Sequence, residues 1–168
     1  NGETINAGDL GGWIEKESNL TGNAWVSDEA QVYGNAKVSG DALVSGNAQV
    51  SGYAIISENV LVYDNAQVDG DTRIIGDAQV SGYAKVDGNA TVDGKAKVSG
   101  DALVTGGARV SGKAKVSGNA LVFGDALVSG DAQVSGNAKV YGDAKVTGKA
   151  KVTGKAQVRS EERRVGKE

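Results

Sequence analysis

Aliphatic residues recur at every sixth position along most of this chain. They run without a break from Leu20 to Val158, making 24 positions, of which 21 are Val. Two residues before each of them lies a small residue, which is Ala in 21 cases. The exceptions are Leu20, Ile56 and Ile74 among the aliphatic residues and Ser18, Val60 and Thr72 among the small ones. Because Val is β-branched and alternate residues of a strand point the same way, each Ala-x-Val step predicts a short strand with these two residues buried.

Glycine punctuates the same repeat. Of the 23 positions two residues past an aliphatic, 20 are Gly, and the others are Asp28, Glu58 and Asp64. Such a position favours φ > 0, which Gly reaches freely and Asp tolerates better than most residues. Each hexad is therefore predicted to be one strand followed by one corner. Identical corners suit a coil better than a series of hairpins, so three hexads predict an 18-residue triangular turn with parallel pairing between turns. Eight turns would be about 38 Å long.

Two stretches carry a resemblance to known families. The uninterrupted pattern V-S-G-N-A-K resembles the hexapeptide repeat of left-handed parallel β-helix proteins, and it covers Ser18 to Val158. The fold class expected is thus an all-β, single-stranded left-handed parallel β-helix, with the handedness implied by the resemblance alone. The stretch AGDLGGWIE, Ala7 to Glu15, resembles the opening of phage-encoded and bacterial hexapeptide-repeat solenoids whose biochemistry is poorly defined. That resemblance implies a non-catalytic or uncharacterised solenoid and a further strand before the motif.

The repeat also divides the chain. Residues 1–17 are expected to be an N-terminal cap or a truncated preceding element, and 18–158 the β-helix. Residues 159–168, RSEERRVGKE, abandon the repeat. They are interpreted either as a polar cap, helical over 161–165, or as a non-native appendage, and the second interpretation is preferred.

Assigning hexads to three sides predicts what each face exposes. Most outward positions are polar, but two apolar clusters emerge on neighbouring turns. The candidate contact residues are Trp25, Leu43, Leu61 and Tyr63 in one cluster and Leu103, Leu121, Phe123 and Tyr141 in the other. They are interpreted either as scattered apolar surface residues or as contact patches for another subunit or a glycan.

Composition narrows the possible partners. The 168 residues carry 18 basic and 21 acidic side chains, a net charge of −3, which disfavours nucleic acid and anionic membranes as partners. No apolar run approaches the roughly 18 residues of a membrane-spanning helix, and residues 1–6 do not form a signal peptide. The compartment is not determined, with a cytoplasmic or virion-associated location expected. The expected partners are further copies of the chain, side by side or end to end, a phage structural protein or a glycan.

Catalytic chemistry finds little support in the residues. Cys and His are both absent, and no loop interrupts the repeat between Leu20 and Val158. Hexapeptide-repeat acyltransferases typically use a His base and an extruded loop, so an acyltransferase-like protein lacking its catalytic part is kept only as an alternative. Asp69, Asp71 and the pair Asp125/Asp143 bring carboxylates near one another without the six to eight oxygens that calcium prefers. No catalytic, cofactor-binding or metal-ligating residue is assigned, and no cofactor is expected.

The function predicted is that of a non-catalytic structural or scaffold β-solenoid of phage or prophage origin. Two alternatives are kept. One is the acyltransferase-like protein, and the other is a glycan- or protein-binding module that uses the exposed aromatic clusters.

Overall fold

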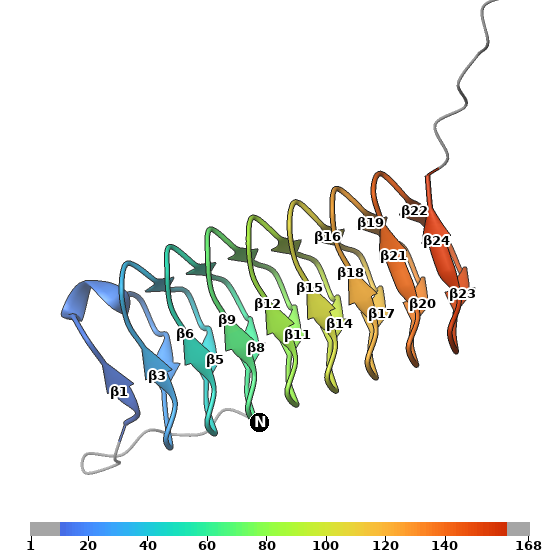
Figure 1. Ribbon diagram of the computed structural model, residues 1–168. Helices are drawn as coiled ribbons and strands as arrows, with labels where there is room; N and C mark the ends of the chain where they lie inside the picture. Colours follow the sequence, from blue (N-terminus) through green and yellow to red (C-terminus); the bar gives the residue numbers. More distant parts are fainter. Residues whose placement is uncertain (1–10, 161–168) are drawn as a thin grey trace, which may run out of the picture.

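The computed structural model describes residues 11–160, which form one continuous coil of parallel strands (Figure 1). Each strand pairs with the strand 18 residues away, as Arg73 does with Ile55 on one side and Thr91 on the other. Three strands complete a turn, and consecutive strands belong to three different sheets. The 18-residue turn, the parallel pairing and the count of about eight turns are therefore confirmed.

Each sheet is named here after its first strand. The β1 sheet contains β1 (Trp13–Ile14), β3 (Gln31–Val32), β6 (Gln49–Val50), β9 (Gln67–Val68), β12 (Lys85–Val86), β15 (Leu103–Val104), β18 (Leu121–Val122), β21 (Lys139–Tyr141) and β24 (Gln157–Arg159). The β2 sheet contains β2 (Trp25–Val26), β5 (Leu43–Val44), β8 (Leu61–Val62), β11 (Gln79–Val80), β14 (Lys97–Val98), β17 (Lys115–Val116), β20 (Gln133–Val134) and β23 (Lys151–Val152). The β4 sheet contains β4 (Lys37–Val38), β7 (Ile55–Ile56), β10 (Arg73–Ile74), β13 (Thr91–Val92), β16 (Arg109–Val110), β19 (Leu127–Val128) and β22 (Lys145–Val146).

The core consists of the two inward residues of each hexad. From Val26 to Val146 every aliphatic position of the repeat is at most 4 % exposed, and the Ala two residues before it is buried as well. Val60 and Thr72, which replace Ala in two hexads, are also fully buried. Burial of one Val is worth about 1.5–3 kcal/mol before entropy, so the stacked Val side chains supply most of the apolar stabilisation. Each turn contacts only the turns before and after it, as expected for a solenoid.

The corners adopt the backbone conformation that the glycine pattern predicts. All 20 corner Gly have positive φ, and within residues 11–160 the non-Gly residues with positive φ are Asp28, Glu58 and Asp64. Two of these carboxylates receive a compensating bond from the next turn: the Gly46 N–H donates to Asp28 Oδ2 and the Gly82 N–H to Asp64 Oδ2, both at 3.0 Å. An acidic residue can therefore replace Gly here because its side chain binds the corner 18 residues ahead.

The first turn departs from the repeat. Strand β1 pairs in register with β3, so the coil already begins before Ser18, the first residue of the predicted repeat. The 3₁₀ helix η1 (Glu17–Asn19) then replaces a hexad, with its backbone closed by the Asn19 N–H donating to the Lys16 carbonyl. The expected inward position of Ser18 is wrong: the helical turn rotates Ser18 outward and buries Asn19 instead, at 2 % exposure.

The paired glycines of the GGW motif allow a close approach at this end. A Cβ on Gly12 would lie 2.6 Å from the Ala30 carbonyl oxygen and 2.8 Å from Val26 Cγ1, distances that real Cβ atoms do not reach. The Gly12 N–H donates to the Val26 carbonyl at 2.7 Å. Gly12 therefore brings the chain directly onto the second turn. Ala7 to Leu10 of the AGDLGGWIE stretch lie outside the described residues.

The opposite end is more open. Ala150 and Ala156 occupy inward positions of the repeat yet are exposed, and Val158 is half-buried. Strand β24 extends to Arg159, one residue past the repeat. The predicted helix and appendage over 161–168 lie outside the described residues.

Candidate functional site

The first predicted cluster lies on the β2 sheet. Trp25, Leu43 and Leu61 are aligned across β2, β5 and β8, because Trp25 pairs with Leu43 and Leu43 with Leu61. Tyr63 follows two residues after Leu61 on the same face. All four side chains are half-buried.

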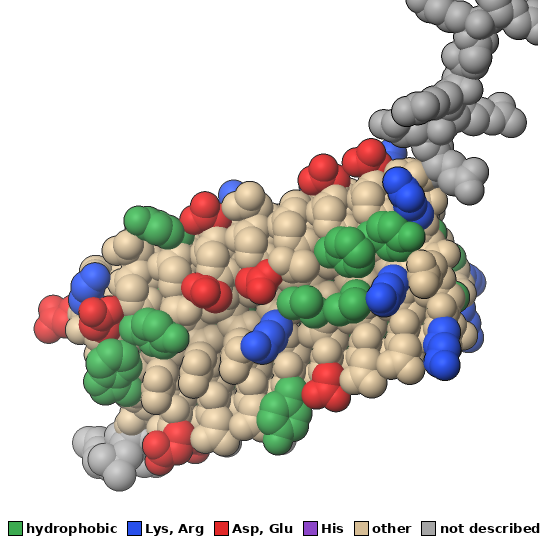
Figure 2. Space-filling model, in the orientation of Figure 1, with side chains coloured by type: hydrophobic (Ala, Val, Ile, Leu, Met, Phe, Trp, Pro, Cys, Tyr) green, Lys and Arg blue, Asp and Glu red, His purple; other side chains and the backbone are tan. Residues whose placement is uncertain are grey.

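The second predicted cluster lies on the β1 sheet. Leu103 pairs with Leu121 across β15 and β18, and the Phe123 and Tyr141 rings stack with centroids 5.1 Å apart and an interplanar angle of 5°. The Tyr141 hydroxyl lies 3.4 Å from Gln157 Oε1. Figure 2 shows this cluster as the apolar group over β15, β18 and β21. The structure thus brings together the members of each predicted cluster and keeps the two clusters on separate faces.

Other exposed apolar residues were not singled out by the sequence. Trp13 is 55 % exposed and its ring lies 6.4 Å from that of Tyr33. Tyr53 and Ile55 border a shallow hollow on the β4 sheet. That hollow is lined by Asn35, Lys37, Tyr53, Ile55, Asp71 and Arg73. The sequence could have located this hollow, because aligning residues 18 positions apart places Tyr53 between Asn35 and Asp71.

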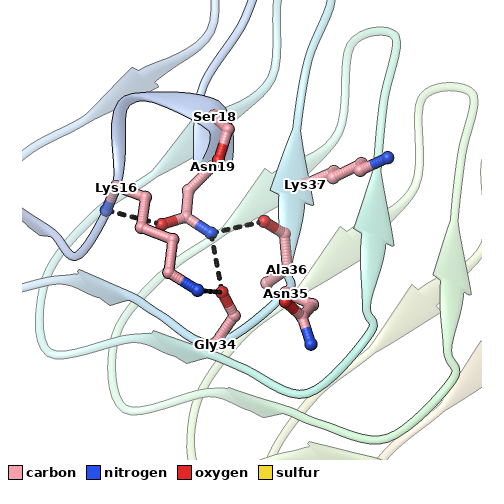
Figure 3. Close-up of a pocket in the computed structure, with 7 residues that line it drawn as sticks. All are labelled: Lys16, Ser18, Asn19, Gly34, Asn35, Ala36 and Lys37. Atoms are coloured by element: carbon pink, nitrogen blue, oxygen red, sulfur yellow. Dashed lines mark hydrogen bonds between the residues drawn. The ribbon is translucent and has the colours of Figure 1, made fainter.

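A second hollow lies beside η1 and is occupied by a hydrogen-bond network (Figure 3). Asn19 Nδ2 donates to the carbonyls of Ala36 at 2.8 Å and Gly34 at 3.3 Å, and Asn19 Oδ1 accepts the Lys16 N–H at 2.8 Å. Lys16 Nζ also donates to the Gly34 carbonyl at 3.2 Å, and Glu15 Oε2 accepts the Gly34 N–H at 2.6 Å. These bonds attach the first turn to the second, so the hollow is a joint rather than a ligand pocket.

The carboxylates considered as metal ligands are distributed along the corners. Asp69 Oδ1 accepts the Ser51 hydroxyl at 3.0 Å, and Asp125 leans over Gly107 in the turn before. Within residues 11–160, no three His, Cys, Asp or Glu residues are grouped as a metal site would require. In the same part of the chain, no helix has the length and hydropathy needed to cross a bilayer.

Charge is distributed unevenly along the solenoid axis. Residues 11–92 carry 11 carboxylates and four basic side chains, a net charge of −7. Residues 93–160 carry five carboxylates and 11 basic side chains, a net charge of +6. The overall charge of −3 conceals this asymmetry, and counting the halves of the sequence separately would have found it. The solenoid is therefore acidic toward β1 and basic toward β24.

Five segments of the chain match the family model described as the YdcK β-solenoid repeat. They are residues 30–46, 36–52, 96–112, 114–130 and 132–148, which together cover 74 of the 168 residues. Each segment begins at an inward Ala and spans almost one turn. No curated protein matches the chain. The parallel fold and the repeat matches together define a parallel β-solenoid repeat protein. Within that class, the repeats of this chain are similar to the YdcK type.

Proposed function

We propose that this protein is a non-catalytic structural element, a rigid spacer or scaffold. The observation that carries the proposal is the unbroken ladder from β2 to β24, in which each strand aligns with one 18 residues away. Every turn is joined to the next by backbone hydrogen bonds on three sides, so bending the coil would stretch bonds on at least one of them. Such a rod holds whatever precedes and follows it at a set distance.

The finer parts of the proposal rest on the resemblances in the sequence. The hexapeptide period supports a left-handed coil, whose hand an experimental diffraction structure would test. The AGDLGGWIE stretch supports a phage or prophage origin. The identity of neighbouring genes in the source genome would test it, and a location among metabolic genes would contradict it.

Removal of one turn tests the spacer role. Deleting residues 85–102 joins Ala84 to Leu103 and keeps every later residue on its own sheet, so the rod should stay folded and shorten by about 4.8 Å. Small-angle X-ray scattering measures the maximum dimension, and circular dichroism measures the strand content. A deletion that unfolds the chain would contradict the idea that length is adjustable turn by turn.

A shorter deletion provides the matched control. Removing residues 85–96 keeps the hexad phase but moves every later residue to another sheet. A pure spacer should tolerate both deletions equally, whereas a binding module whose contact face extends across the deleted turn should lose binding only after the second. That comparison distinguishes the scaffold from a module that uses a face running along the whole solenoid.

The enzyme alternative has its own test. An acyltransferase-like role predicts release of free thiol from acetyl-coenzyme A in the presence of amine or hydroxyl acceptors. The scaffold proposal predicts that, with either class of acceptor, the chain releases thiol no faster than buffer alone. Turnover above that rate would overturn the proposal.

A further inference from the structure

The three faces of the solenoid differ in how they display charge. The outward residues of the β4 sheet include Lys37 and Arg73 toward one end and Arg109 and Lys145 toward the other, with one carboxylate, Asp93, whose Oδ2 lies 2.8 Å from Arg109 Nη2. On the β2 sheet the charged outward residues are Lys97, Lys115 and Lys151. Among the described residues, no outward position of these strands, and no residue directly after one of them, is a carboxylate. Neither face separates acidic side chains at one end from basic side chains at the other.

The face of the β1 sheet is different. From Trp13 to Asp87 it carries Glu15, Asp69 and Asp87 against Lys85, a net charge of −2. From Leu103 to Arg159 it carries Lys139 and Arg159, a net charge of +2. Leu103 and Leu121 of the apolar cluster lie between the acidic and the basic side chains, and Figure 2 shows acidic side chains on the side of β9 and β12. Across β9 to β24 this face is acidic at one end, where Asp69 and Asp87 outweigh Lys85, and basic at the other, so it is complementary in net charge to itself when reversed along the axis.

The aromatic geometry bears on which occupant fits. With parallel planes and centroids 5.1 Å apart, the Phe123 and Tyr141 rings cover part of each other's faces. A sugar ring usually requires an open aromatic face, whereas these rings present their edges. Together with the half-buried Leu103 and Leu121 on the neighbouring rungs, the stacked rings form an apolar strip, which suits packing against another protein surface.

We infer that two copies of this chain associate side by side and antiparallel through the face of the β1 sheet. A two-fold axis between β15 and β18 places Leu103 opposite Leu121 of the second copy at the centre. The same axis places Asp69 opposite the second copy's Arg159, and Asp87 opposite the second copy's Tyr141. This inference goes beyond the proposed scaffold role and does not depend on it.

The arrangement contains one unfavourable pair. Lys85 lies opposite the second copy's Lys139, and Asp87 on the same strand end offsets part of the repulsion. The overlap extends over six rungs of the β1 sheet, about 29 Å. A concentration-dependent dimer is expected rather than a permanent one.

Sedimentation velocity of the full 168-residue chain at increasing concentration tests the inference. The expected result is a shift from monomer to dimer, with no larger species, that weakens as salt increases. A chain that stays monomeric up to about 1 mM at low salt overturns the inference. A Kd near 1 mM corresponds to a binding free energy of only about 4 kcal/mol.

Substitutions that imitate other turns locate the interface. The double variant Leu121→Gln/Phe123→Ser copies Gln49 and Ser51, which occupy the same two columns of the β1 sheet, so the fold should persist. Dimerisation should weaken at least tenfold. Leu43→Gln in the other cluster is the matched control and should leave the dimer unchanged. The opposite pattern overturns the choice of face.

Charge reversal determines the orientation. Asp69→Arg or Arg159→Asp alone should weaken the dimer about tenfold, and the double variant Asp69→Arg/Arg159→Asp should restore it. Lys85→Gln should strengthen it several-fold, because it removes the unfavourable pair and Gln already occupies this column at positions 31, 49 and 67. A double reversal without restoration, or a Lys85→Gln dimer that is weaker than the parent, overturns the antiparallel arrangement.

Discussion

The interior turns and the two terminal turns obey different rules although they share one repeat. In the interior, every corner lies against the corner 18 residues ahead, and a Cβ on Gly88 would lie 2.8 Å from the Gly106 nitrogen. At the β24 end, Gly154 has the same positive φ but meets no atom within 4 Å. At the β1 end, the hexad gives way to η1 and a buried Asn19. The difference teaches that the hexad describes contact between turns, so its constraints relax where one neighbouring turn is absent.

A buried charge in the middle of the ladder should have the largest effect. Val98 is fully buried in β14, and Val98→Asp would place a carboxylate among Val and Ala without a partner. We expect a loss of more than about 4 kcal/mol in the free energy of unfolding. Val158→Asp, at the half-buried last position of the repeat, should cost less than about 1 kcal/mol. Thermal denaturation followed by circular dichroism compares them, and equal costs would contradict the distinction between interior and end.

Corner substitutions sharpen the same comparison. Gly88→Ala and Gly154→Ala each place a Cβ at positive φ, which costs about 1–2 kcal/mol. Gly88→Ala should cost at least another 1 kcal/mol or so, because the corner of Gly106 must move. Urea denaturation measures both, and identical midpoints would show that the turns separate freely at their corners.

An acidic corner should recover part of that loss. Gly88→Asp introduces a carboxylate that can accept the Gly106 N–H, as Asp28 and Asp64 accept those of Gly46 and Gly82. It should therefore be less destabilising than Gly88→Ala by about 1 kcal/mol. A Gly88→Asp variant less stable than Gly88→Ala would contradict the role assigned to these acids.

The joint at the β1 end depends on Asn19. Asn19→Ala removes the side-chain bonds to the carbonyls of Gly34 and Ala36 and to the Lys16 N–H. Because the Ala36 carbonyl and the Lys16 N–H lose these partners, unfolding should become easier by about 2 kcal/mol. Asn35→Ala, an exposed position on the next turn, is the control and should change stability by less than about 0.5 kcal/mol. Hydrogen exchange should show faster exchange confined to the first two turns in Asn19→Ala.

The smallest effect expected is a gain. Thr72 is fully buried where most turns have Ala, and its hydroxyl oxygen has no hydrogen-bond partner in the described residues. Thr72→Val keeps the shape and removes the unsatisfied group, so stability should rise by about 1 kcal/mol. Val60 shows that Val fits at the same position of another hexad. A decrease in melting temperature would indicate that the Thr72 hydroxyl is bonded after all.

Much of the fold could be predicted because the repeat is local. The period of six identifies inward Val and Ala, and the corner pattern identified Asp28, Glu58 and Asp64 as the non-Gly residues at positive φ. The candidate contact residues were assigned to the correct faces because an 18-residue turn follows from three hexads. Their role as contacts stays a prediction. The inward assignment of Ser18 was wrong because a 3₁₀ turn shifts the phase by one residue, and nothing in the hexad signals that shift.

By itself, then, the sequence determined the period, the buried positions and the strained corners, since each depends on a residue's own φ preference and side chain. Only the tertiary structure decided the geometry in which side chains meet across turns. The parallel stacking of the Phe123 and Tyr141 rings and the Asn19 network both arise from residues 15 to 18 positions apart. They depend on how the turns are superimposed, which no single hexad encodes.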